Sequence, residues 1–213
     1  MTTLKAAWIL CALSAIVSLI VLQLIPTGLE LPLHWGIDGQ VDRYGPAWVA
    51  LFMPPAIMAI VLGIFSSLKW LEPRKENLQQ STHARSGILL AVILMMLVIQ
   101  AGNIAIAFAR EVSMDRLAIF AVGLVLIITG NFLSKTRSNF FIGIRTPWTL
   151  SSDDVWRKTH RLGSKLFMLA GVIILSGSWI ITQQALIYLV LSSILPAALI
   201  PVFYSWWLWH QTS

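Results

Sequence analysis

The chain has 213 residues, of which 57% are hydrophobic and only 11% are charged, and its mean hydropathy is +0.79. Soluble domains carry about 25% charged residues, so this composition excludes a water-soluble globular protein and predicts an integral membrane protein. The formal net charge is +6, and a single cysteine, Cys11, excludes a framework of intrachain disulfides.

Six apolar stretches approach the length of about 20 residues that a helix needs to span a bilayer. They cover residues 6–25, 47–68, 87–109, 117–133, 166–182 and 185–208. The first lacks a small-residue cleavage site before Pro26, which predicts a retained helix rather than a signal peptide. We therefore expect an all-α, polytopic membrane protein with six transmembrane helices.

The basic residues are distributed unevenly among the loops. The N-terminal flank and the second and fourth loops hold 12 of the 15 Lys and Arg residues, and the other loops hold 3. The positive-inside rule then predicts that both termini are cytoplasmic and that the loop after the first helix faces outward.

Three amides lie inside the predicted spans: Gln100, Asn103 and Asn131. Hydrogen bonding between helices is the expected use of such groups, and the lining of a polar path is the alternative. No span carries a charge near its middle, which argues against an ion-coupled transporter.

The first loop, residues 31–46, reads LPLHWGIDGQVDRYGP. Its Asp-Gly pair predicts a turn between short strands at residues 33–37 and 40–44, and so a small ordered cap. A ligand surface here would consist of His34, Trp35, Asp38, Gly39, Asp42 and Tyr44. The alternative is that these residues have structural roles only. Asp38 would then stabilise the turn, Asp42 would be a solvated surface residue, and His34 and Trp35 would anchor the loop at the membrane interface. The acidic and histidine residues lack a tight ligand spacing, so no metal is expected.

The fourth loop contains the most polar stretch, residues 139–165. Ser151 or Ser152 can cap a helix whose first turn holds Asp153 and Asp154. This helix is amphipathic and precedes the fifth span. Its basic face, expected to contact anionic lipids of the inner leaflet, consists of Arg157, Lys158, Arg161 and Lys165.

Trp156 and His160 are four residues apart and share one side of this helix, near the border between its faces. We expect them to pack with Arg145 into one cluster at the inner membrane surface. His160 is expected to act as a hydrogen-bonding anchor, with proton transfer as the alternative. Asp153 and Asp154 point about 100° apart and form no carboxylate pair. Neither an enzyme nor a cofactor is predicted.

The residues of this stretch resemble the defining motif of the SdpI family. The matching positions are Phe141, Gly143, Arg145, Thr146, Thr149, Trp156, His160 and Gly163. The outer-loop run LPLHWGIDGQVDRYG is similar to an N-terminal domain of unknown function that often accompanies this motif. The resemblance implies two units. Residues 1–70 would form an N-terminal two-helix unit with the outer loop, and residues 87–213 would form an SdpI-like four-helix domain that includes the motif.

The resemblance implies a multi-pass protein of the bacterial cell membrane. The member that gives the family its name protects its cell from a secreted peptide toxin and, when occupied, holds a transcriptional repressor at the membrane. The implied partners are an extracellular peptide toxin and a cytosolic repressor, without direct nucleic-acid binding. The alternative function is a small-solute transporter or channel. The oligomeric state stays open.

Overall fold

The computed structural model describes residues 3–36 and 38–212. Its elements are α1 (Thr3–Leu24), β1 (Glu30–Trp35), β2 (Val41–Pro46), α2 (Ala47–Leu71), α3 (Lys75–Gln80), α4 (Thr82–Ala107), α5 (Met114–Leu133), α6 (Pro147–Ser151), α7 (Asp153–Ile180), η1 (Gln183–Ala185) and α8 (Leu186–Thr212). Six of these helices are long and apolar enough to cross a membrane. The predicted six-span helical membrane protein is confirmed, and the one sheet in the described part of the chain is the small β1–β2 hairpin.

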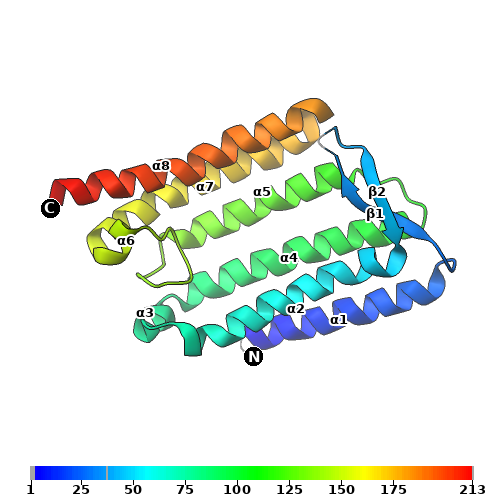
Figure 1. The fold of residues 1–213 in the computed structure, drawn as a ribbon, viewed down its shortest axis with the longest axis horizontal. Helices are drawn as coiled ribbons and strands as arrows, with labels where there is room; N and C mark the ends of the chain where they lie inside the picture. The colour runs from blue at the N-terminus through cyan, green and yellow to red at the C-terminus, as the bar shows by residue number, and fades with distance from the viewer. Residues whose placement is uncertain (1–2, 37, 213) are drawn as a thin grey trace.

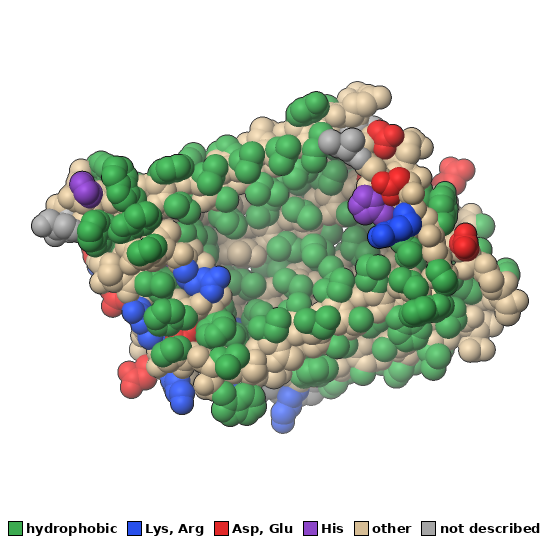
Figure 2. Space-filling model, viewed as in Figure 1, with side chains coloured by type: hydrophobic (Ala, Val, Ile, Leu, Met, Phe, Trp, Pro, Cys, Tyr) green, Lys and Arg blue, Asp and Glu red, His purple; other side chains and the backbone are tan. Residues whose placement is uncertain are grey.

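The six long helices lie in chain order, each packed against the next (Figure 1). α4 also contacts α1, whereas α7 packs between α5 and α8. The β1–β2 hairpin covers one end of this array, and α3, α6 and both chain termini lie at the other (Figure 1). Figure 2 shows a mainly hydrophobic surface between two ends at which charged side chains gather.

The predicted amphipathic helix and the fifth span form one continuous helix, the 28-residue α7. At 1.5 Å per residue α7 is about 42 Å long, whereas the hydrocarbon core of a bilayer is about 30 Å thick. About eight residues therefore extend beyond the hydrocarbon, and Asp153 begins this protruding part. The short helices α3 and α6, which we did not expect from the sequence, lie at the same end.

The predicted hairpin is present but longer than expected, because β1 begins at Glu30 and β2 ends at Pro46. The strands pair antiparallel, and Leu31 is buried among side chains of α1, α2 and α4. Ile37, which we expected to end the first strand, lies outside the described residues. This contact of Leu31 with the helices explains the extra length, since it orders the chain before the turn.

Small residues bring α5 and α7 into close contact. A Cβ atom on Gly171 would lie 2.7 Å from the Gly123 carbonyl oxygen, and one on Gly130 would lie 2.8 Å from the Met168 nitrogen. The Ser164 hydroxyl donates to the Gly130 carbonyl at 2.6 Å. This arrangement is typical of membrane helices. Their association in lipid depends on close packing of the backbones and on polar contacts between helices, rather than on the hydrophobic effect. It sets the position of α7, which carries the motif.

Candidate functional site

The motif is built around two stacked rings on α7. Trp156 and His160 are 1% and 0% exposed, and their ring centroids lie 3.9 Å apart with an angle of 18° between the ring planes. The Trp156 indole N–H donates to the Thr136 carbonyl at 3.0 Å, which ties α7 to the segment after α5. We expected the pair near the border between two helix faces. It is instead fully buried, because the motif loop, which we define as residues 134–146 between α5 and α6, covers this part of α7.

Both ring nitrogens of His160 are engaged. Nδ1 lies 2.8 Å from the Trp156 carbonyl oxygen, which only accepts, so Nδ1 carries a proton. Nε2 accepts the Ile144 backbone N–H at 2.9 Å and therefore contributes its lone pair. This arrangement requires the neutral imidazole and leaves neither nitrogen free for a metal or a substrate. His160 is thus placed to anchor the motif loop.

Gly143 lets the loop reach this histidine. Its φ is +128°, a conformation that side chains rarely adopt. An added Cβ would lie 2.4 Å from His160 Nε2 and 2.9 Å from Trp156 Cη2. Glycine is therefore required here for both its backbone angle and its size. Gly163 plays a related packing role, since a Cβ there would lie 2.6 Å from the Cδ1 atom of Ile144.

The two motif threonines begin the short helix α6. Thr146 is extended ahead of Pro147, and its hydroxyl accepts the Thr149 N–H at 3.1 Å. The Thr149 hydroxyl in turn accepts the Thr146 N–H at 2.9 Å and donates to the Ile144 carbonyl at 2.9 Å. This reciprocal cap makes the segment before α7 an ordered turn. The Thr-Pro-x-Thr spacing was its signal in the sequence.

Two further residues, Asn139 and Glu72, hold the motif loop, and we did not infer either of them from the sequence. Asn139 is fully buried, and its side-chain oxygen accepts the backbone N–H groups of Phe141 at 2.9 Å and Ile142 at 2.7 Å. Glu72, 1% exposed at the end of α2, accepts the N–H groups of Phe140 and Arg74, each at 2.9 Å. Phe141 itself points into a cavity beside the loop.

Further bonds join the connector between α2 and α4 to the motif loop. The Arg74 guanidinium donates to the Ser138 hydroxyl and, at 2.9 Å, to the Leu150 carbonyl. Asn77 donates to the Ser138 carbonyl at 2.8 Å, and the Ser81 hydroxyl accepts the Arg137 N–H at 2.9 Å. We call Glu72, Arg74, Asn77 and Ser81 the connector latch. Their sequence separations of 56 to 76 residues explain why no local pattern indicated it.

Arg145 does not join the ring pair as we expected. Its side chain is exposed, and its guanidinium donates to the Phe140 carbonyl, so it spans the motif loop. Ser152 rather than Ser151 caps α7. On the basic face, Arg157 and Lys158 each lie 2.8 Å from Asp154, and the remaining members, Arg161 and Lys165, are exposed.

The outer residues have identifiable structural partners. His34 Nδ1 lies 2.7 Å from Asp42 in an exposed pair, and Asp38 accepts the Gln40 N–H at 3.1 Å. Gly39 has a φ of +75°, as the turn requires. Tyr44 is exposed and Trp35 is half-buried. Within residues 3–36 and 38–212, no group of three His, Cys, Asp or Glu side chains is placed to hold a metal.

The intramembrane amides divide into two groups. Gln100 accepts the Ser14 hydroxyl at 2.6 Å and donates to the Ser18 hydroxyl at 2.8 Å, and Asn103 donates to the Ala50 carbonyl at 2.8 Å. Both are therefore engaged between α1, α2 and α4. Asn131 differs, since its side chain is exposed near the end of α5 rather than held between helices.

Comparisons with known proteins cover most of the chain. Residues 135–205 match the SdpI/YfhL protein family, and residues 9–59 match a domain of unknown function, DUF1648. The Immunity protein SdpI of Bacillus subtilis (strain 168) is 30% identical over 166 residues, which is 78% of this chain and 76% of that protein. No solved structure matches. The motif geometry and these similarities lead to one conclusion: the chain belongs to the SdpI family of multi-pass membrane proteins.

Proposed function

We propose that this protein protects a bacterial cell against an extracellular peptide toxin, or senses such a toxin, from within the cell membrane. The support is its similarity to a protein named as an immunity protein over more than three quarters of both chains. In this proposal the hairpin faces outward and the motif end is cytoplasmic, as the distribution of basic residues indicates.

The structural observation that supports sensing is the link through α2. At one end, Ala47 follows β2 directly, and its N–H donates to the Leu29 carbonyl at 3.0 Å. At the other end, Glu72 accepts the Phe140 N–H of the motif loop. One helix therefore joins the outer hairpin to the motif. In this proposal a ligand that moves the hairpin shifts α2 and changes the latch. Contiguous packed elements of this kind can carry coupling between two sites.

A cytosolic partner or the membrane surface would contact the exposed basic face. Arg161 and Lys165 add positive charge beyond the pairs with Asp154, and anionic inner-leaflet lipids attract such residues. A repressor held at the membrane would use the same face. The transporter alternative has less support, because Gln100 and Asn103 bond to neighbouring helices.

Protection is tested by expression in a strain that is sensitive to secreted antimicrobial peptides, including the toxin of the family's name-giving member. We expect the wild-type chain to raise survival and the exposed hairpin variant Tyr44→Ala to lose part of that protection. The matched control is Trp70→Ala, an exposed aromatic at the opposite end of α2. Unchanged survival with wild-type protein demonstrably in the membrane would reject immunity to those peptides.

The signalling part requires a separate experiment. Replacing Arg157, Lys158 and Arg161 with Gln should abolish recruitment of a cytosolic repressor to membranes while toxin protection continues. Recruitment that survives the triple replacement would remove the basic face from the proposal.

The orientation is tested in a Cys11→Ala background, in which an impermeant maleimide should label Asp38→Cys but not Lys75→Cys in intact cells.

A further inference from the structure

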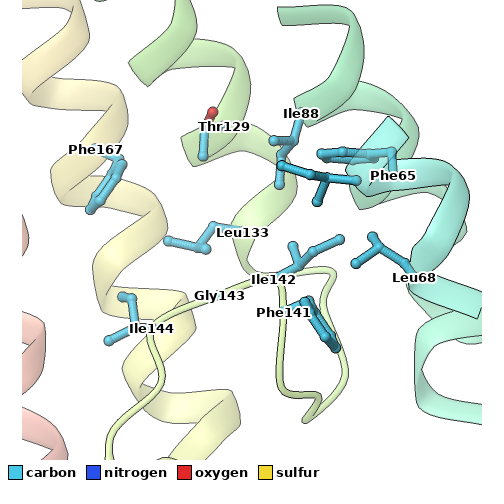
Figure 3. A pocket seen from close by; sticks show the side chains of 11 residues that line it. Phe65, Leu68, Ile88, Thr129, Leu133, Phe141, Ile142, Gly143, Ile144 and Phe167 are labelled. Carbon is cyan, nitrogen blue, oxygen red and sulfur yellow. The ribbon is translucent and has the colours of Figure 1, made fainter. Parts of the chain in front are cut away.

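A cavity of about 330 Å³ lies beside the motif loop, between α2 and α7 (Figure 3). Its lining residues come from α2, α4, α5, α7 and the motif loop, and the labelled side chains surround it in Figure 3. It is lined by Ile64, Phe65, Leu68, Ile88, Thr129, Leu133, Phe141, Ile142, Gly143, Ile144 and Phe167. Thr129 supplies the one side-chain polar atom in this set, so the lining is suited to hydrocarbon rather than to water.

The cavity exists because the helices beside it pack elsewhere. α2 packs against α1 and α4, and α7 packs against α5, α6 and α8. The loop from Phe141 to Ile144 crosses the space between α2 and α7 and closes it at the motif end (Figure 3). Figure 2 shows that the surface is hollowed between the two ends of the molecule. In a bilayer, a space of this kind is in contact with acyl chains.

A cation is bonded to the segment that lines the cavity. Arg145 follows Ile144, a lining residue, and its guanidinium bonds to the Phe140 carbonyl, next to the lining residue Phe141. The guanidinium is thus held across the two ends of the segment that closes the cavity. Within the described chain, no carboxylate lies within 4.0 Å of it. A guanidinium has five N–H donors in a planar fork that matches phosphate, so donors remain for a ligand.

We propose that Arg145 and this cavity together bind one anionic phospholipid. An acyl chain occupies the cavity between α2 and α7, and the phosphate accepts hydrogen bonds from Arg145 at the membrane surface. The combination of an unneutralised cation with an adjoining apolar space favours this amphiphile over free phosphate, which would leave the cavity unfilled. Bound lipid would fill the space behind the motif loop and support its position on His160. This inference is independent of toxin immunity.

The experiment uses the full chain in bilayers made of equal parts phosphatidylethanolamine and phosphatidylglycerol. Lipids that stay bound after transfer to detergent are counted by native mass spectrometry. We expect one retained phosphatidylglycerol on the wild-type protein. Loss of a charge-assisted hydrogen bond costs about 1.5–3 kcal/mol, so Arg145→Gln should reduce the preference for phosphatidylglycerol about tenfold or more. Some lipid with either headgroup would remain on this variant, because the cavity is intact.

Two cavity-filling variants from different helices, Thr129→Phe and Ile88→Phe, should lose the retained lipid of both kinds. The matched control is Arg161→Gln, which removes an exposed charge from the basic face and leaves the cavity lining unchanged. A variant is interpreted only if its unfolding curve matches that of the wild-type protein. Two cavity-filling variants are used so that the test remains possible if one of them fails to fold.

Three outcomes would overturn the proposal. The first is phosphatidylglycerol preference that survives in Arg145→Gln, and the second is retention of lipid by a folded cavity-filling variant. The third is displacement of the lipid by inorganic phosphate alone, which would assign the site to a soluble anion. Equal loss of preference in Arg161→Gln and Arg145→Gln would indicate general surface charge and would also reject the specific site.

Discussion

Gly143→Ala tests whether the close contact between the motif loop and the ring pair holds the loop in place. The new Cβ would lie 2.4 Å from His160 Nε2, at a φ of +128°. His160 cannot yield easily, because Nδ1 is bonded to Trp156 and the rings are stacked. The loop must therefore move away, and the Ile144 N–H loses its acceptor.

The magnitude follows from two contributions. A strained backbone angle costs about 1–3 kcal/mol, and a buried donor left without a partner costs about 1–3 kcal/mol. Together they predict a loss of about 2–6 kcal/mol from the local stability of the loop. Since about 1.4 kcal/mol corresponds to a factor of ten in an equilibrium constant, exchange of the Ile144 amide should accelerate tenfold or more. Hydrogen exchange followed by mass spectrometry of the loop peptide measures this.

Gly28→Ala is the matched control. Gly28 also has a positive φ, +81°, but an added Cβ there meets no atom within 4 Å. The Gly28→Ala variant should therefore lose only the stability that the strained backbone angle costs, about 1–2 kcal/mol. In addition, His160→Ala should relieve the clash, so the effects of Gly143→Ala and His160→Ala should be non-additive. Equal losses of stability in Gly143→Ala and Gly28→Ala, or strict additivity in the double variant, would refute the reasoning.

Three further predictions concern the polar contacts that hold the helices and the loop. Glu72→Gln keeps an acceptor but removes its charge, so it should weaken the bond to the Phe140 N–H by about 1 kcal/mol. Faster exchange of that amide measures this, and unchanged exchange would contradict the latch. Gln100→Leu should lower the free energy of unfolding by about 0.6–1.7 kcal/mol in a denaturant titration, and a stability equal to wild type would show that these bonds contribute nothing. Ser152→Ala should remove the α7 cap at a cost of about 0.5–2 kcal/mol, whereas Ser151→Ala should cost less; the reverse order would reassign the cap.

The motif shows which structural features the local sequence pattern could predict. A serine before two aspartates predicted the start of α7, because a helix cap acts within a few residues. The pairing of Trp156 with His160 followed from their spacing of four. Helical periodicity did not reveal how deeply they are buried, since that depends on the loop that covers them.

Other residues were understood only from the three-dimensional contacts. Glu72 reads as an ordinary charged residue at the end of a membrane helix, yet it is 1% exposed and bonds to a residue 68 positions away. Arg145 was expected in the buried cluster, but the loop turns its side chain outward onto Phe140. Asn131 was expected to lie in a helix contact, but its side chain on α5 is exposed.

The sequence by itself determined the membrane class and the six spanning helices, because hydropathy over about 20 residues is a property of each segment alone. It also indicated the family through a contiguous motif, and the charge distribution predicts which end is cytoplasmic. The tertiary structure decided what the polar groups bond to. It placed the connector latch on the motif loop, assigned both nitrogens of His160, and left an apolar cavity beside Arg145. These features depend on segments far apart in the chain meeting in space, and no local pattern encodes such a meeting.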